Sequence, residues 1–192
     1  MPKPEEAQKG PEPEPLLQKL LETRNLVLSQ EISDESVHKV IQQLLLLEAM
    51  DATKPIRIFI NSPGGSADGG FAIFDTIRFI EPPVITIAAG LVASAASIVL
   101  LAPKKENRVA FPHSRILLHQ PSTHLQGSAA DLEITAQEIL KLREKANQLI
   151  ADETGQTVEK VASDTNRDYW MGPDEALKYG LVSRIVRSRA EL

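Results

Sequence analysis

The chain has 192 residues and a formal net charge of −5 at pH 7, from 21 lysines and arginines against 26 acidic residues. This length suits one domain with a single hydrophobic core. The absence of cysteine excludes disulfides, thiol nucleophiles and thiolate metal sites, and makes the cytoplasm the expected compartment. The acidic balance argues against a nucleic-acid partner, which would need a basic stripe, and favours a protein or peptide partner.

The beginning of the chain is rich in Pro, Glu, Lys and Gln and offers almost nothing to bury. Such a composition cannot offset the entropy lost on folding. We therefore predict a disordered tail over residues 1–14, followed by one folded domain over residues 15–192.

Apolar residues beyond the tail change spacing repeatedly between a helical and a strand period. This alternation of strands and helices predicts a parallel, right-handed βαβ architecture. The predicted elements, in order, are a helix near 16–21, a strand at 25–28, a helix from 33 toward 51, a strand at 56–60, a helix at about 71–79, a strand at 84–89, a helix from about 94 to 101, and strands at 108–111 and 115–119.

Residues 84–102 carry no charge, and the run reaches the length at which a membrane span is usually proposed. Prolines at both ends and the polar residues Thr86, Ser94 and Ser97 argue against a span. A strand followed by a buried helix explains the run equally well. We expect a core element and no membrane partner.

A long helix is predicted over residues 128–154, which contain neither Gly nor Pro. At 1.5 Å per residue it would extend roughly 40 Å, too far to lie within so small a domain. Its apolar residues form one stripe, and Gly155 is the expected stop. A projecting helix with an apolar stripe indicates a partner. A short helix framed by Pro173 and Gly180 and a strand near 181–186 complete the chain.

Two strand-to-helix turns present groups suited to acyl transfer. Residues 61–66 read Asn-Ser-Pro-Gly-Gly-Ser, whose exposed N–H groups can meet a developing negative oxygen, although a tight turn alone explains the pattern. Ser94 begins an apolar helix between the small residues Ala93 and Ala95. Such a serine is usually only an N-cap, and the spacing is not that of a G-x-S-x-G elbow. The alternative is a nucleophile, with the Ala95 N–H as an oxyanion donor.

A base and an orienting acid can be chosen from position. Of four histidines, only His119 ends an apolar strand, and active sites gather at the carboxyl ends of parallel strands. Asp168 lies in residues 164–170, predicted to be irregular, directly before Tyr169 and Trp170, which we expect to shield it from water. Such an acid would fix the imidazole tautomer. A satisfied structural histidine and a surface acid in a turn remain the alternatives.

Together these segments resemble the proteolytic subunit of the Clp protease, the ClpP family, over residues 16–186. The resemblance implies a crotonase-like α/β fold of repeated ββα units, in which the long handle helix interleaves two stacked sevenfold rings into a closed chamber. Four motifs stand in the family's order and spacing: Asn-Ser-Pro-Gly-Gly at 61–65, Gly-x-x-Ala-Ser at 90–94, His-Gln-Pro at 119–121 and Asp-Thr-x-Arg-Asp at 164–168.

The resemblance also implies the activity, that of a serine endopeptidase that needs no cofactor and no metal. Ser94 would be the nucleophile, His119 the general base and Asp168 the orienting acid. The backbone N–H groups of Gly65 and Ala95 would form the oxyanion hole. Substrate would be bound by Gly64, Ser66, Ser122, Thr123, His124 and Leu125.

The implied partners are further copies of the chain, unfolded polypeptide, and a ring-shaped ATPase of the ClpX, ClpA or ClpC type. Phe59 and Phe79 match aromatic positions at which the ATPase docks, whereas Arg57 stands where the family often has an aromatic residue. Asn166 replaces a usual acid beside the triad. The sequence leaves open whether the rings contain one chain or also a ClpP paralogue.

Two other functions remain open at this stage. An acyl-CoA hydratase or isomerase of the crotonase fold also uses paired N–H groups, but it would not need Ser94, His119 and Asp168 together. A non-catalytic subunit of a mixed ring is the second alternative. Such subunits typically lose triad residues, and this chain keeps all three.

Overall fold

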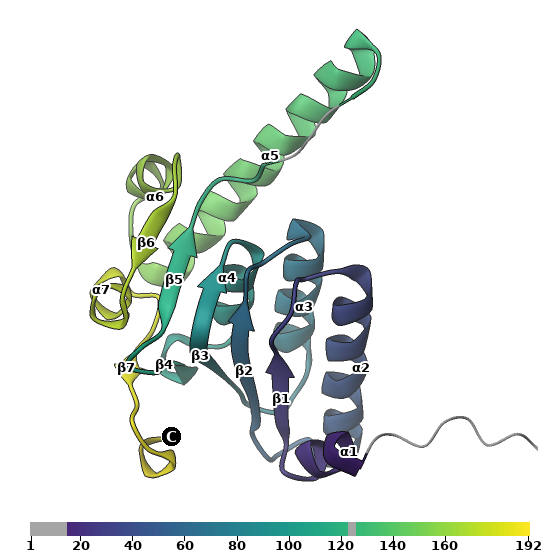
Figure 1. The fold of residues 1–192 in the computed structure, drawn as a ribbon, viewed down its shortest axis with the longest axis vertical. Coiled ribbons are helices and arrows are strands. Elements are labelled where there is room, and N and C mark those ends of the chain that lie inside the picture. The colour runs from purple at the N-terminus through teal and green to yellow at the C-terminus, as the bar shows by residue number, and fades with distance from the viewer. Residues whose placement is uncertain (1–14, 123–125) are drawn as a thin grey trace, which may run out of the picture.

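The computed structural model describes residues 15–122 and 126–192, so the predicted tail over 1–14 lies outside the described residues. A seven-stranded sheet is covered on one face by helices, and one long helix projects from it (Figure 1). The elements are α1 (Pro15–Glu22), β1 (Asn25–Leu28), α2 (Asp34–Met50), β2 (Ile56–Ser62), α3 (Ala67–Phe79), β3 (Val84–Ala93), α4 (Ala95–Leu100), β4 (Arg108–Ala110), β5 (Arg115–Leu118), α5 (Ala129–Thr154), α6 (Val158–Asp164), β6 (Tyr169–Met171), α7 (Pro173–Tyr179) and β7 (Arg184–Ile185), with 3₁₀ turns η1 (Lys105–Asn107) and η2 (Arg189–Glu191).

Strand β3 is the branch point of the sheet. The main path runs β1-β2-β3-β4-β7, and all of its pairings are parallel. The first half of β3 pairs with β4, and its second half pairs in parallel with β5. Strand β6 then adds to β5 in the antiparallel sense. The carboxyl ends of β3 and β5 therefore lie side by side at one edge of the sheet.

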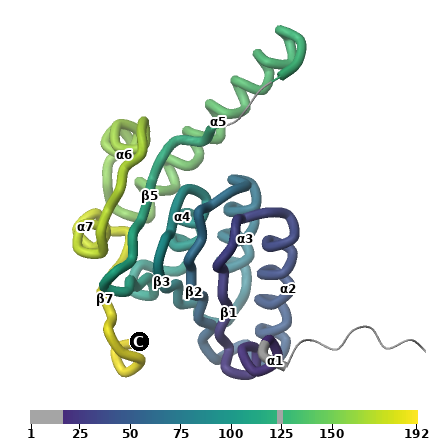
Figure 2. Tube along the Cα trace, in the orientation of Figure 1, coloured from purple at the N-terminus to yellow at the C-terminus, as the bar shows by residue number. Residues whose placement is uncertain are grey.

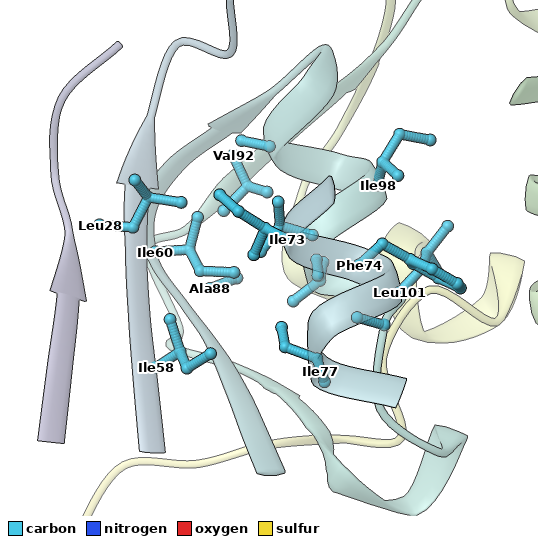
Figure 3. Packing of buried hydrophobic residues seen from close by; sticks show 14 of the residues in the cluster. Leu28, Ile58, Ile60, Ile73, Phe74, Ile77, Ala88, Val92, Ile98 and Leu101 are labelled. Carbon is cyan, nitrogen blue, oxygen red and sulfur yellow. The ribbon is translucent and has the colours of Figure 1, made fainter. Parts of the chain in front are cut away.

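The main core lies between the sheet and the helices α2, α3 and α4. In β2, alternate residues are buried, so Ile58 and Ile60 face the helices, where Ile73 and Ile77 of α3 meet them (Figure 3). Full burial of one such side chain contributes about 1.5–3 kcal/mol. Helix α2 begins at a capping box in which Ser33 accepts a hydrogen bond from the Ser36 N–H.

The uncharged run of the sequence is divided between two elements. Residues up to Ala93 form β3, and α4 follows directly after Ser94. Both elements are largely buried, which explains why the run lacks charge. Within residues 15–122 and 126–192, no helix combines the length and apolar character needed to cross a membrane.

Helix α5 confirms the predicted long helix, with Ser128 as its N-cap and Gly155, in the left-handed conformation, at its end. Its base is packed into the domain, where Asn147, Ile150 and Ala151 are buried. The other end extends away from the body of the molecule (Figures 1 and 2). On that part the apolar side chains of Ile134 and Leu140 are exposed.

The predictions for the last third of the chain need correction. Residues 164–170 are not irregular throughout, because Asp164 ends helix α6 and Tyr169 begins strand β6. The strand expected near 181–186 is reduced to two residues, β7. Strand β6 has three residues and pairs with a segment about fifty positions earlier, so neither length nor local periodicity could reveal it.

An ion cluster around the buried Arg108 fixes the end of α5 to strand β4 of the sheet. Arg108 in β4 is only 1 % exposed. Its guanidinium donates to the Pro103 carbonyl at 2.7 Å, to the Glu153 carbonyl at 2.8 Å and to the Glu153 carboxylate. Arg78 donates to the same carboxylate at 2.6 Å. Burial lowers the pKa of Arg108, and the Glu153 carboxylate opposes that shift by stabilising the charge.

Glu153→Gln should destabilise the fold, because it leaves the buried Arg108 charge without its counter-ion. Loss of a hydrogen bond to a charged group lowers the free energy of unfolding by about 1.5–3 kcal/mol. Urea denaturation followed by circular dichroism, at fixed protein concentration, measures the change. Glu144→Gln, at an exposed position of the same helix, is the matched control. Equal stability of the two variants would contradict the role given to Glu153.

Candidate active site

Ser94 occupies a strained turn between β3 and α4. Its backbone angles are φ 56° and ψ −125°, a region that residues with a side chain rarely adopt. Its N–H donates to the Leu117 carbonyl at 3.0 Å, and its carbonyl accepts from the Ser97 N–H at 2.9 Å and the Ser97 hydroxyl at 2.6 Å. The Ser94 side chain makes no capping hydrogen bond. The structure therefore does not support the alternative that Ser94 serves only as an N-cap, and its hydroxyl can serve another role.

The glycine pair of the 61–66 turn lies directly against Ser94. Gly64 has φ +91°, and a Cβ at this position would come within 2.5 Å of the Ala93 carbonyl oxygen and 2.7 Å of the Ser94 Cβ. Only glycine permits this approach. It brings the turn containing Gly65 beside the turn containing Ala95.

The backbone N–H groups of Gly65 and Ala95 are both placed to donate. Gly64 and Ser66 supply the carbonyl and the N–H that bridge to Ile32, which leaves the Gly65 N–H out of that bridge. Ala95 is the first residue of α4, a position whose N–H has no acceptor within the helix. Two N–H donors next to a serine hydroxyl suit stabilisation of a tetrahedral oxyanion.

His119 and Asp168 are brought together by the β5–β6 ladder. Leu118 pairs with Tyr169 in the antiparallel sense, so His119, directly after β5, and Asp168, directly before β6, lie opposite each other. The His119 Nδ1 and Asp168 Oδ1 atoms are 3.1 Å apart. This contact orients the ring, and no hydrogen bond to Nε2 occurs among the residues that the structure describes.

The prediction that Tyr169 and Trp170 shield Asp168 is wrong. The Asp168 side chain is 63 % exposed, whereas that of His119 is 27 % exposed. Tyr169 turns toward Tyr179, with ring centroids 5.8 Å apart, and Trp170 stacks under Arg115, whose guanidinium carbon lies 4.4 Å from the ring centroid. Neither aromatic ring therefore covers the Asp168 carboxylate.

Further hydrogen bonds, which no local sequence pattern predicts, hold the His119 and Asp168 segments together. The Gln120 N–H donates to the Thr165 carbonyl at 2.7 Å, and its side chain donates to the Asn166 carbonyl at 2.7 Å. Thr165 is buried, and its hydroxyl lies 2.9 Å from the Asn147 side-chain oxygen on α5. These contacts join elements distant in sequence, so only the position of Gln120 directly after His119 hinted at a role.

A cavity of about 470 Å³ connects the two halves of the site. Ser94, His119, Gly65 and Ala95 all line it, as do Ser66 and Ser122. Asp168 lies on the far side of His119, in a separate hollow. Among the described hydrogen bonds, His119 is joined to Asp168, and none joins the Ser94 hydroxyl to His119.

The remaining candidate residues fall in three places. Thr123, His124 and Leu125 lie outside the described residues. Phe59 packs against Phe111 at 6.3 Å, in a small cluster on the sheet face opposite the main core. Phe79 stands exposed at the end of α3. No group of three potential metal ligands occurs within the described parts of the chain.

Comparison with known proteins decides the family. A family model described as Clp protease matches residues 8–189. The chain belongs to the Clp protease family. The "ATP-dependent Clp protease proteolytic subunit 2" of Treponema denticola is 54 % identical over 177 residues, 92 % of this chain and 88 % of that protein. Subunit 1 of Bacillus cereus is 47 % identical over 171 residues, 89 % of each chain.

A solved structure extends the match to three dimensions. A mutant of ClpP1 from Listeria monocytogenes superimposes with a TM-score of 0.85 at 43 % identity, covering 91 % of this chain and 98 % of that one. The ClpP-type α/β fold predicted from the motifs is confirmed. The chain is a serine endopeptidase of the Clp protease family, which removes the acyl-CoA hydratase and isomerase alternatives.

Ser94 should be the only serine labelled by a fluorophosphonate, because only a hydroxyl with an adjacent base and oxyanion donors is sufficiently activated. Mass spectrometry of the digested, labelled protein locates the adduct. Ser97, one turn further on, is the internal control, since its hydroxyl is engaged with the Ser94 carbonyl. Labelling of Ser97 instead of Ser94, or no labelling of the assembled protein, would show that Ser94 is not the nucleophile.

Proposed function

We propose that the chain cleaves peptide bonds with Ser94 as nucleophile, His119 as general base and Asp168 as orienting acid. The observation that carries the proposal is the shared cavity, which holds Ser94 and His119 while His119 contacts Asp168 from behind. A serine, a base and a third group that orients the base define such a site by geometry.

In the proposed mechanism the Ser94 hydroxyl attacks the scissile carbonyl while His119 takes its proton through Nε2. Asp168 accepts a hydrogen bond from the Nδ1–H of His119 and stabilises the imidazolium. The N–H groups of Gly65 and Ala95 bind the negative oxygen of the tetrahedral intermediate. His119 then protonates the leaving amine as the peptide bond breaks. In the second half, His119 takes a proton from water, which attacks the acyl carbonyl, and returns it to the Ser94 oxygen as the ester bond breaks.

Substrate is proposed to bind as an extended strand along residues 64–67, which include Gly64 and Ser66, and along residues 122–126. Backbone hydrogen bonds would supply most of the affinity, so the sequence preference should be broad. Beside the strand, the cavity has an apolar wall that includes Phe71, Ile98 and Leu142. Unfolded polypeptides and short peptides fit this mode, since their backbone N–H and C=O groups are not already paired in secondary structure.

Assembly is proposed to follow the family pattern, with two stacked sevenfold rings joined by α5. The exposed apolar residues on the projecting part of α5 support a partner at this helix. A cytoplasmic ring-shaped ATPase of the ClpX, ClpA or ClpC type would feed the chamber. Phe59 lies on the sheet face opposite the main core and Phe79 is exposed at the end of α3, so a docking pocket that used both would draw them from two neighbouring copies.

The isolated chain is proposed to be a weak peptidase. Asp168 is largely exposed, and no hydrogen bond joins Ser94 to His119 among the described residues. An error near 1 Å can lower the rate about 10²-fold. Neighbouring copies, a ClpP paralogue or a docked ATPase would then raise activity by favouring the aligned arrangement.

Ser94→Ala and His119→Ala should each abolish peptide cleavage, and the double variant should be little worse than either. Triad members act as a unit, so their effects on rate are not additive. Initial rates of a fluorogenic peptide measure this, with native mass spectrometry to verify that each variant assembles. Additive losses, or a His119→Ala variant with ordinary activity, would show that the two residues do not work together.

The rate per chain should rise with protein concentration and with added partner, and Asn166→Asp should raise the activity of the chain alone. Asn166 accepts from Gln120 and stands where the family often has an acid, so a restored charge could pair with an arginine such as Arg167 across an interface. Peptidase assays over a dilution series test this. Full activity of the chain alone, with no gain from a partner or from the substitution, would contradict it.

A further inference from the structure

The cavity beside Ser94 has a single acidic side chain in its described lining. Its described lining consists of Gly65, Phe71, His119, Asp68, and several prolines, alanines, serines and aliphatic residues. Asp68 is the only carboxylate among them, and no lysine or arginine is included. A single charge in a cavity with low-dielectric walls focuses its field into the space where substrate lies.

Asp68 is held close to the proposed catalytic groups by the start of α3. Ser66 caps this helix by accepting a hydrogen bond from the Gly69 N–H at 3.0 Å. Asp68 is therefore in the first turn, three residues after Gly65, one of the two proposed oxyanion donors. A substrate strand that runs along residues 64–67 would pass this carboxylate.

The carboxylate of Asp68 is not neutralised within the described parts of the chain. Asp68 is exposed, and it takes part in none of the ion pairs or side-chain hydrogen bonds formed between described residues. The lining residue Phe71 is contacted by Lys145, whose ammonium lies 4.0 Å from the ring centroid. This contact engages the lysine with the ring and forms no ion pair with Asp68.

We infer that Asp68 is a specificity determinant, which favours peptides with lysine or arginine near the scissile bond and disfavours those with aspartate or glutamate. The inference rests on the proposed function, because it places substrate in the Ser94 cavity. Charge complementarity acts through the rate of productive binding, so kcat/KM is the quantity that should respond.

A purely structural role for Asp68 makes a different prediction. An acid in the first turn is also stabilised by the helix dipole. If this were its only role, replacing Asp68 would change thermal stability but would not alter the order in which peptides are cleaved. The ratio of kcat/KM for two peptides on one enzyme separates the roles, because folding and assembly cancel from it.

The test uses one neutral fluorogenic peptide and variants that carry Lys, Gln or Glu at each of three positions on either side of the scissile bond. In at least one position, the Lys peptide should be cleaved about 5- to 10-fold faster than the Glu peptide at low salt, with Gln between them. The ratio should shrink in about 0.5 M salt, because screening shortens the reach of an exposed charge.

Asp68→Asn should bring this Lys-to-Glu ratio close to one, whereas Asp75→Asn, an exposed position two turns further along α3 and outside the cavity lining, should retain it. A ratio near one in the unchanged protein, or a ratio that survives Asp68→Asn, would overturn the inference. Labelling of Ser94 by fluorophosphonate and cleavage of the neutral peptide test the proposed function separately, so failure of either is distinguishable from failure of the charge preference.

Discussion

The hydrogen bond from the Ser94 N–H to the Leu117 carbonyl, at 3.0 Å, joins the two halves of the site. It continues the parallel ladder in which Ala93 of β3 pairs with Leu117 of β5. Because parallel strands present their carboxyl ends at the same edge, Ser94 and His119 leave the sheet side by side. The antiparallel strand β6 begins where β5 ends, so Asp168 arrives at the same edge from the opposite direction. Three residues distant in sequence therefore depend on one branched strand, β3.

The two halves of the site differ in how firmly they are held. Ser94 is fixed by backbone hydrogen bonds on both of its sides, and the close approach of Gly64 allows no side chain between the two turns. The packed core around β3 and α4 holds Ser94 in its strained backbone conformation. His119 and Asp168, in contrast, sit at the rim, where the carboxylate is open to solvent and the connecting strand has three residues. The proposed nucleophile and oxyanion donors are thus held in place within one chain, whereas the proposed orienting acid, Asp168, is largely exposed.

Local signals in the sequence were sufficient for most of the main core. Alternating and helical spacing predicted β2 and α2, and the absence of Gly and Pro predicted α5. Strand β6 could not be found in this way, because its pairing with β5 is non-local and too short to show a period.

For the site, motif order and strand ends pointed to Ser94, His119 and Asp168, and the structure brings His119 and Asp168 into contact. The shielding of Asp168 was misjudged because side chains of a strand alternate between faces, so Tyr169 and Trp170 turn to different neighbours. Asp68 belongs to none of these motifs. Its position in the cavity depends on tertiary packing, which no local sequence pattern predicts.

The stacking of Trp170 beneath Arg115 has a spectroscopic consequence. The chain contains a single tryptophan, and it stands two residues along β6 from Asp168. Indole emission from this protein therefore originates at one position, on the strand that directly follows the proposed orienting acid. Its ring is partly open to water and lies against a guanidinium, so any rearrangement of the β5–β6 ladder changes the polarity around the fluorophore. The molecule carries its own optical probe of this ladder, and no label has to be introduced beside the site.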